Sequence, residues 1–445
     1  LKTIHVTTGM RLPSLRKEAQ QSAKESEPDH LELARQTVKS IGSENVLYAD
    51  NSFWIWGNNG VWNKRPDIEL KRLIQSTLES GGHVVTAPRI GGVADVLRSE
   101  CYISGHIFNQ GNPDVINCTN GELELIDGKW TLVSHRREHY RTTQIPVDYN
   151  PNATAPQFVQ FLHDLFRDDF DRDCKIQSVC EMIGYTLLAH SKHEKFAMLI
   201  GSGANGKSVL LSIVEALCGE RNVAGVQPAN FNSRFQRAHL HMKLANIVTE
   251  LKQGEIIADA ELKAITSGEI STVEHKNADP FNMRAFSTCW FGTNHLPHTR
   301  DFSDALFRRA IILPFNRKFG EAEQDRDLKR KLTKELPGIL NWAIHYYSQA
   351  QNIGLIDPPS SKEAKRHWRI EADQVAQFVE EKCEADATAR LAIGEIYREF
   401  DIWARQSGIR QIVGKQAMGD RLERLGFKRV RSNGSHVDGL KLRQF

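Results

Sequence analysis

Residues 195–208 read Lys-Phe-Ala-Met-Leu-Ile-Gly-Ser-Gly-Ala-Asn-Gly-Lys-Ser, and this stretch decides the fold of the chain. An apolar run typical of a strand leads into a loop of the form G-x-x-x-x-G-K-S, and an apolar helical pattern follows over 209–218. Glycines let the backbone amides of such a loop turn toward phosphate oxygens, its lysine supplies a positive charge, and its serine hydroxyl binds Mg²⁺. We therefore predict that ATP and Mg²⁺ bind the loop residues Gly201, Ser202, Gly203, Ala204, Asn205, Gly206, Lys207 and Ser208.

Apolar strands alternate with helical patterns from residue 191 to about 352, which predicts an α/β domain with a parallel sheet. Two of these strands end in polar side chains, Glu250 and Asn294. Because the carboxyl ends of parallel strands meet at one edge of a sheet, both side chains should lie beside the loop. We expect Glu250 to activate water and Asn294 to contact the γ phosphate, although each residue taken alone is also compatible with an ordinary strand end or turn.

The metal ligands are only partly defined by the sequence. Many phosphate-loop ATPases place two acids together at the end of the second strand, whereas Thr249 precedes Glu250 here. We expect Ser208 and Glu250 to hold Mg²⁺. The sequence leaves open whether phosphates and water complete the coordination or whether Asp259 assists.

Arg308 and Arg309 follow a short helical segment that begins at Asp304, and they precede the apolar run 310–315. Paired arginines commonly lie on a solvated or acid-paired surface. The alternative is an arginine finger that reaches the nucleotide of a neighbouring subunit and neutralises charge on the transferring phosphate. The sequence does not decide which arginine would act, but a site completed in this way implies a ring of subunits.

The ordered series of the G-x-x-x-x-G-K-S loop, Glu250, Thr293-Asn-His-Leu-Pro297 and Asp304 to Arg309 resembles superfamily 3 helicases of phage, plasmid and poxvirus primase-helicases. The resemblance covers about residues 45–445. It implies a hexameric, AAA+-like ring that hydrolyses ATP, translocates on single-stranded DNA in the 3′ to 5′ direction and opens forked DNA. It also implies an upstream primase region or other replication proteins as partners. Flanking segments that carry the resemblance are 120–125, 146–151, 183–185 and 335–342.

In these helicases a hairpin between the second and third strands lines the central channel. The corresponding segment here is 259–284, with a helix near its start and a turn around 274–280. The resemblance implies that cations of this segment hold DNA phosphates. Lys276 is the first expectation, followed by His275, Lys263 and Arg284.

The predicted organisation has six parts. A leader from an upstream region covers 1–44, a small α+β domain covers 45–154, a helical section covers 155–190 and the ATPase domain covers 191–352. A linker is predicted over 353–370 from the run Pro358-Pro-Ser-Ser361. Three helical patterns and two short strands over 371–445 predict a winged-helix-like domain.

The last of these parts is basic. The segment from Lys415 to Phe445 contains eight Lys or Arg residues and three Asp or Glu residues. Clustered cations are typical of phosphate contacts, so we expect Arg429 and Arg431 to bind DNA, together with Arg421, Arg424 and Lys428. The alternative is a solvated surface that serves only protein contacts.

The composition limits the class of protein. Among 445 residues, 40% are hydrophobic and 25% charged, which is typical of a globular protein, and no apolar run reaches the roughly 20 residues of a bilayer helix. Seven cysteines without a C-x-x-C pair predict reduced thiols, and we expect a cytoplasmic location in a bacterial or virus-infected cell. The chain begins without Met, which we interpret as a piece of something longer.

Two other functions remain open at this point. One is a DNA-binding replication initiator that uses ATP only to switch its assembly, without unwinding. The other is a phosphate-loop kinase acting on a small molecule, which would have no use for Asn294 together with the two arginines.

Overall fold

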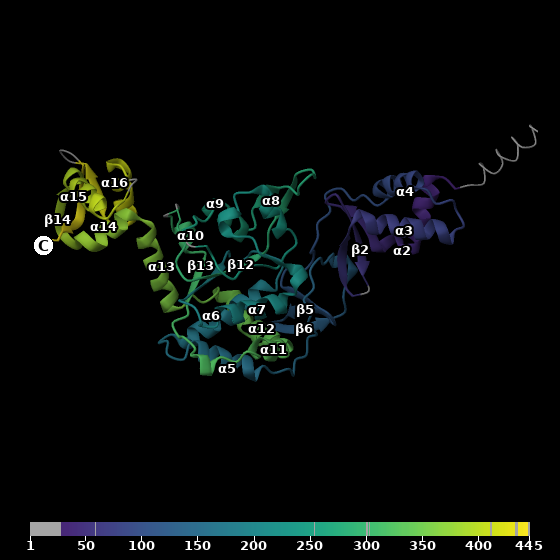
Figure 1. The fold of residues 1–445 in the computed structure, drawn as a ribbon, viewed down its shortest axis with the longest axis horizontal. Coiled ribbons are helices and arrows are strands. Elements are labelled where there is room, and N and C mark those ends of the chain that lie inside the picture. The colour runs from purple at the N-terminus through teal and green to yellow at the C-terminus, as the bar shows by residue number, and fades with distance from the viewer. Residues whose placement is uncertain are drawn as a thin grey trace, which may run out of the picture. The chain divides into compact units, whose positions relative to one another are not determined.

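The computed structural model describes residues 28–57, 59–252, 254–299, 301, 303–409, 412–431 and 435–443. These residues form two compact units (Figure 1). The smaller contains the described residues up to Asn112 together with Ser134–Thr143, and the larger contains Pro113–Val133 and the chain from Gln144 onward. The first part of the predicted leader, 1–27, lies outside the described residues.

The smaller unit packs three helices with a three-stranded antiparallel sheet of order β1-β2-β3. Its core includes Leu33 on the first helix, Leu70 and Ile74 on the second and Val93 on the third, all at most 1% exposed. The elements are α2 (His30–Ile41), η1 (Ser43–Asn45), β1 (Val46–Ala49), β2 (Ser52–Gly57), β3 (Val61–Arg65), α3 (Asp67–Ser80), α4 (Ala87–Glu100) and η2 (Arg137–His139).

The prediction of a leader over 1–44 is wrong for residues 30–41. These residues form α2, and its side chains Leu33 and Ala34 are buried in the core of the smaller unit. The helix is capped at its start, where the Asp29 carboxylate accepts from the Glu32 amide at 2.8 Å. Its polar composition concealed a narrow apolar stripe, which is all that a surface helix needs to dock.

The larger unit begins with an antiparallel sheet of order β4-β5-β6, formed by β4 (Val115–Cys118), β5 (Gly121–Ile126) and β6 (Lys129–Val133). Ile116 and Leu123 join the main core of this unit. The Trp130 indole donates to the Ile344 carbonyl at 3.1 Å and to the Ser348 hydroxyl at 2.7 Å. The compact units therefore divide inside the range 45–154, where the sequence predicted one α+β domain.

At the centre of the larger unit lies a five-stranded sheet of order β13-β7-β12-β9-β8, in which every pair is parallel. Alternate residues of β7 enter different cores, with Ala197 and Leu199 on one face and Phe196 and Met198 on the other. Since both faces are covered, the strands are mostly apolar, and Asn246 of β9 bonds the backbone of Val226. The predicted α/β class with a parallel sheet is confirmed. Its strands are β7 (Phe196–Ile200), β8 (Val223–Ala224), β9 (Ala245–Val248), β12 (Thr288–Thr293) and β13 (Ala310–Pro314).

Helices cover both faces of this sheet, and Figure 1 shows α6, α7 and α12 on one side of it and α8 and α9 on the other. α6 and α12 pack closely: a Cβ added at Gly184 would lie 2.6 Å from the Ala343 carbonyl oxygen. The helices are α5 (Pro156–Leu165), α6 (Arg172–Thr186), α7 (Lys207–Cys218), η3 (Glu220–Asn222), η4 (Pro228–Asn230), α8 (Arg234–Arg237), η5 (Ala238–Leu240), α9 (Asp259–Thr266), α10 (Asp304–Phe307), η6 (Glu321–Glu323), α11 (Leu328–Thr333) and α12 (Leu336–Ile353).

The linker predicted over 353–370 is wrong, because most of it forms α13 (Pro359–Ala372), which runs alongside β13 (Figure 1). The Ser361 hydroxyl accepts from the Ile312 amide at 3.0 Å. Trp368, 1% exposed, donates through its indole to the Pro297 carbonyl at 2.7 Å. The prolines and serines that suggested a linker begin a helix instead, since proline is compatible with the first helical turn.

The C-terminal module comprises α14 (Gln374–Lys382), β14 (Cys383–Ala392), α15 (Ile393–Gln406), α16 (Lys415–Arg424), β15 (Lys428–Arg431) and β16 (Ser435–Leu442). Its antiparallel sheet has the order β14-β16-β15, and its own core includes Phe378, Phe400 and Leu440. The sequence predicted three helices and two strands here but not β14, whose residues are mostly exposed or partly exposed and so carry no apolar alternation. The winged-helix assignment itself stays a prediction.

None of the helices in the described part of the chain combines the length and the apolarity that crossing a bilayer requires.

A buried cation joins α6 to the sheet. The side chain of Lys175 is 0% exposed, and its ammonium lies 2.9 Å from the Asp169 carboxylate and 3.9 Å from that of Asp171. It also donates to the carbonyl of Pro314, at the end of β13, at 2.9 Å. Removing this ammonium would leave two carboxylates, each less than a tenth exposed, without their partner.

We therefore expect Lys175→Met to lower the free energy of unfolding by about 3 kcal/mol, because a broken buried ion pair costs far more than an exposed one. Arg330→Met is the matched control. Arg330 pairs with Asp327 with both side chains about 60% exposed, and its loss should cost less than about 0.5 kcal/mol. Urea unfolding followed by tryptophan fluorescence measures both changes, and equal stabilities of the two variants would contradict the expectation.

Candidate functional site

The glycine-rich loop connects the end of β7 to the start of α7, at the carboxyl edge of the parallel sheet. Gly203, Ala204 and Gly206 have φ values of 95°, 49° and 81°, so the backbone turns through left-handed conformations that glycine adopts freely. A Cβ on Gly206 would also lie 2.4 Å from Leu165. No side chain caps the start of α7, which leaves its first amides available to an anion.

Lys207 lies at the floor of this loop and is 8% exposed. Its ammonium donates to the Gly201 carbonyl at 2.5 Å, to the Asn205 amide oxygen at 3.1 Å and to the Asn294 amide oxygen at 3.4 Å. Burial lowers the pKa of Lys207, and the negative charge of Glu250 acts in the opposite direction. The ammonium is therefore fixed in position before any ligand arrives.

The ends of β9 and β12 bring Glu250 and Asn294 to the same place. The Asn294 amide nitrogen lies 3.5 Å from a Glu250 carboxylate oxygen, while its amide oxygen accepts from Lys207. Asn294 thus links the ammonium to the carboxylate. The structure brings together the three residues that the sequence placed at this edge, and both Glu250 and Asn294 remain exposed to solvent.

A cavity of about 790 Å³ opens over these residues. One side is the loop with Ser208, Glu250 and Asn294. The other sides come from α5 and from the segment 319–328, which sequence reasoning missed because neither contains a motif and both are distant in the chain. The lining residues from these segments are Pro156, Gln157, Gln160, Phe161, Asp164, Phe319, Glu323, Gln324, Asp325, Arg326 and Leu328.

The structure shows which carboxylates lie near enough to the cavity to be considered as metal ligands. Asp259 does not line the cavity, and its carboxylate accepts from the Thr299 hydroxyl. Glu323 and Asp325 line it, but the Gly320 amide lowers the pKa of Glu323, and the Lys331 ammonium lowers the pKa of Asp325. Ser208 and Glu250, the metal ligands expected from the sequence, both line the cavity.

The two arginines have different surroundings. The guanidinium of Arg309 is buried; it donates to the Ala305 carbonyl at 2.7 Å, the Glu194 carboxylate at 2.7 Å and the Ser267 hydroxyl at 2.6 Å. Arg308 is exposed and does not line the cavity of its own chain. These three bonds hold Arg309 in its own chain, which favours a structural role for it and leaves Arg308 as the candidate for the finger.

The hairpin predicted within 259–284 is present as β10 (Ile270–Val273) paired antiparallel with β11 (Phe281–Arg284). Lys276 is exposed in the turn between them. The His275 ring stacks on Phe281 with ring centres 5.5 Å apart, and Arg284 donates to the Gly268 carbonyl at 3.1 Å.

Lys263 differs from this group. It lies on α9 rather than on the hairpin, and its ammonium pairs with Asp301. Its role as a DNA contact is therefore not favoured.

The residues of the C-terminal module that the sequence predicts to bind DNA have different surroundings. Arg429 and Arg431 lie on β15 and line a separate cavity there. Arg421 instead pairs with Asp373 at 2.8 Å, with side chains 20% and 6% exposed, and so holds α16 to the start of α14. Arg424 and Lys428 are exposed.

Comparisons with known proteins match different parts of the chain. Residues 34–167 match the D5 N terminal like family, and residues 199–309 match a family of unknown function, DUF5906. The apo structure of the NrS-1 C-terminal region covers 94% of this chain and 100% of that chain, with 12% identity and a TM-score of 0.49.

Viral relatives match over longer stretches. "Putative helicase 184R" of Invertebrate iridescent virus 6 is 22% identical over 344 residues, which are 66% of this chain and 35% of the relative. "Putative helicase L207/L206" of Acanthamoeba polyphaga mimivirus is 21% identical over 255 residues, which are 52% of this chain and 27% of the relative. The chain thus spans about a third of the length of these relatives. The D5 N terminal like region and the viral relatives together support a place for the chain in the phage and viral primase-helicase family.

Proposed function

We propose that the chain is the ATP-driven motor of a superfamily 3 DNA helicase that acts in the replication of a phage, plasmid or virus. The observation that carries the proposal is the linked set Lys207, Asn294 and Glu250 at the mouth of a cavity whose volume is typical of small-molecule sites. The viral helicases to which the chain is related support the same activity.

Each residue of the set has a task in ATP hydrolysis. Lys207 and the loop amides bind the β and γ phosphates, and Ser208 and Glu250 hold Mg²⁺, which neutralises charge on the phosphates when bound. Glu250 orients and deprotonates the attacking water. Asn294 now bonds both Lys207 and Glu250, so a γ phosphate that displaces these bonds changes its position and reports the nucleotide state.

The remaining cavity wall suits the nucleoside. Pro156 and Phe161 supply apolar surface, and Gln157, Gln160 and Gln324 supply hydrogen-bonding groups around it. Arg317, which pairs with Glu323 at 2.6 Å and donates to the Asp164 carbonyl at 2.8 Å, joins the two segments of this wall. The cavity therefore provides a phosphate end and a base end on one chain.

A second cation that neutralises charge on the transferring phosphate can come from a neighbouring subunit. Arg308 is exposed and lies outside the cavity of its own chain, which favours an arginine finger that acts on the neighbouring copy. We propose a homo-oligomeric ring, with six subunits as the resemblance to superfamily 3 helicases implies.

DNA passes along the hairpins of this ring. Lys276 at each exposed turn contacts a phosphate of single-stranded DNA, with His275 and Arg284 in support. Movement in the 3′ to 5′ direction would open forked DNA in the cytoplasm of a bacterial or virus-infected cell. Partners would include an upstream primase region or other replication proteins, since the chain corresponds to only part of its relatives.

The first prediction concerns the catalytic carboxylate. Glu250→Gln should reduce ATP turnover by about 10²- to 10⁴-fold, because an amide cannot accept the proton of the attacking water. Binding of a fluorescent ATP analogue should persist. Glu255→Gln is the matched control, since Glu255 does not line the cavity. Steady-state phosphate release gives the rates, and unchanged turnover by Glu250→Gln would refute the assignment.

The second prediction separates the neighbouring arginines. Arg308→Ala should lower ATP turnover by about 10³-fold or more without lowering the melting temperature, because Arg308 acts on a neighbouring nucleotide. Arg309→Ala should instead destabilise the fold by about 2 kcal/mol, because it removes a buried guanidinium that donates to the Ala305 carbonyl, the Ser267 hydroxyl and the partly exposed Glu194 carboxylate. Thermal melts and ATPase rates measure both.

A mixing experiment tests action between subunits. Arg308→Ala protein keeps an intact loop, and Lys207→Ala protein keeps an intact arginine, so mixed rings contain some complete sites. Turnover in the mixture should exceed that of either variant alone. No recovery, with mixed rings present by mass measurement, would contradict a finger supplied by the neighbour.

The third prediction concerns the hairpin. Lys276→Ala should abolish stimulation of ATP turnover by single-stranded DNA and the unwinding of a forked duplex, while basal turnover stays unchanged. Lys192→Ala, which removes another exposed lysine, should have no effect. If the unaltered protein binds DNA but neither unwinds it nor hydrolyses ATP faster with it, the switch-type initiator is the better description. A persistent monomer with a non-hydrolysable ATP analogue would favour a small-molecule kinase.

A further inference from the structure

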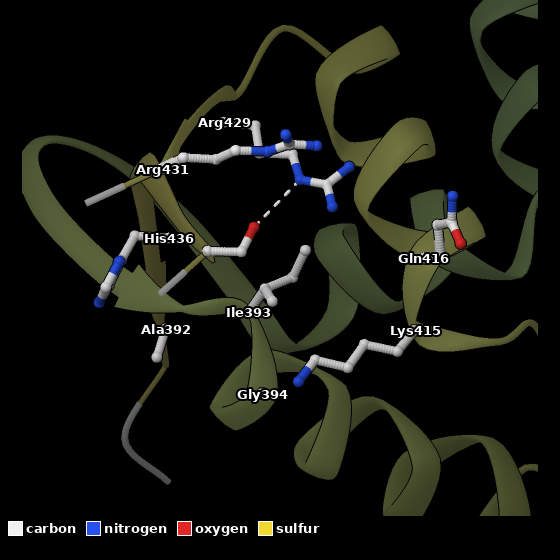
Figure 2. Close-up of a pocket in the computed structure, with 9 residues that line it drawn as sticks. Ala392, Ile393, Gly394, Lys415, Gln416, Arg429, Arg431 and His436 are labelled. Atoms are coloured by element: carbon white, nitrogen blue, oxygen red, sulfur yellow. Dashed lines mark hydrogen bonds between the residues drawn. The ribbon is translucent and has the colours of Figure 1, made fainter. Parts of the chain in front are cut away.

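The C-terminal module contains a second cavity, of about 630 Å³, formed where the starts of α15 and α16 meet the β15–β16 ribbon. Figure 2 shows Arg429 and Arg431 extending from the ribbon and Lys415 extending from α16 toward Gly394. We call this cavity the basic pocket. Its lining residues are Ala392, Ile393, Gly394, Lys415, Gln416, Arg429, Arg431, Ser435 and His436.

The charge of the basic pocket is positive. Three permanent cations line it, and the described residues of its lining include no carboxylate. Arg429 is partly neutralised because its guanidinium pairs with Asp420 at 3.0 Å and donates to the Ser435 hydroxyl at 3.1 Å (Figure 2). Lys415 and Arg431 are both exposed. An anion that entered the pocket would relieve the repulsion among these cations.

The backbone adds to this positive potential. Ile393 and Gly394 are the first residues of α15, and Lys415 and Gln416 are the first residues of α16. The caps are Ala392 and Gly414, and neither helix start is closed by a side-chain hydrogen bond. Two helix amino ends therefore present unsatisfied N–H groups and the positive ends of their dipoles at one pocket.

Space for a ligand depends on the glycine at the start of α15. The Lys415 ammonium lies 3.1 Å from the position that a Cβ on Gly394 would occupy. The lysine can therefore lie against the first turn of α15 because Gly394 has no side chain there. The pocket thus combines room and positive charge with the amides of two helix starts.

We propose that the basic pocket binds a phosphate group of DNA. The guanidinium of Arg431, the Lys415 ammonium and the helix-start amides surround a compact oxyanion better than they would a flat apolar ligand. The inference rests on the proposed function in taking DNA as the ligand, but it does not depend on ATP hydrolysis or unwinding. Two sources supply this chemistry, an internal phosphodiester and a terminal phosphate, and the experiment separates them.

The test uses the full chain without nucleotide and a fluorescent 20-base-pair DNA duplex. Lys415→Ala combined with Arg431→Ala should weaken binding by about tenfold and flatten the salt dependence of log K by about one to two units, for any duplex sequence. Arg429 is kept because its ion pair with Asp420 holds the ribbon to α16. The matched control is Arg398→Ala with Arg405→Ala, which removes the same charge from exposed positions of α15 outside the pocket.

A second variant tests the pocket without a change of charge. Gly394→Leu places a side chain where the Lys415 ammonium now lies, and leucine is tolerated in the first turn of a helix better than glycine. It should weaken duplex binding by a factor similar to that of the charge variant. Thermal melts of all variants should match that of the unaltered protein, and a variant that fails this check is replaced by Arg431→Gln alone.

The outcomes are decisive in each direction. Tighter binding of a 5′-phosphorylated duplex than of an unphosphorylated one, lost in the pocket variants, identifies a terminal phosphate; equal binding identifies the backbone. Equal weakening by the control pair, or unchanged binding by Gly394→Leu, would overturn the proposal. If an acidic peptide bound at the basic pocket and DNA did not, the proposal would be overturned in favour of a protein partner. ATP turnover without DNA should be unchanged throughout, so a failure here is distinguishable from a failure of the motor.

Discussion

The structure depends on one geometric constraint, the convergence of the parallel strands β7, β9 and β12 at a single edge. Both faces of the sheet are buried, so its strands are mostly apolar, and the amide of Asn246 inside β9 is satisfied by the backbone of Val226. The polar side chains that stay exposed to solvent follow the strand ends. Lys207, Glu250 and Asn294 follow those ends and are linked by contacts of 3.4 Å and 3.5 Å through Asn294. A carboxylate and an ammonium are thereby held close without a direct ion pair, which leaves both free to act on a ligand.

Charge elsewhere in the larger unit is divided between structural and exposed positions. Lys175 and Arg309 are buried, and their hydrogen bonds fix α6 and the segment before β13 to neighbouring elements. Arg308, one residue away, remains exposed. The C-terminal module shows the same division, because Arg421 and Arg429 pair with aspartates while Lys415 and Arg431 face a pocket. In these examples the cations that are buried or paired with acids hold the fold, whereas Lys207 is buried at the floor of the loop without an acid partner.

The errors of prediction have a common physical cause. A polar helix with a narrow apolar stripe, α2, resembled a leader, and the Pro-Pro-Ser-Ser start of α13 resembled a linker. Each element is stabilised by contacts with distant residues, such as the bond from Trp368 to the Pro297 carbonyl. Strand β14 was missed because an edge strand that buries little beyond Cys383 lacks the alternation that identifies a strand. Local patterns do not record partners that lie far away in the chain.

The sequence by itself determined the parallel-sheet class, the glycine-rich loop and the identity of the residues at the strand ends, because short-range spacing and strand order are sufficient to specify them. Only the tertiary structure decided which arginine is exposed, that Asp259 lies outside the cavity, and that α5 and 319–328 complete its walls. It alone also brought the starts of α15 and α16 to one basic pocket. Exposure and the meeting of distant segments are properties of packing, and packing is set by the whole chain at once.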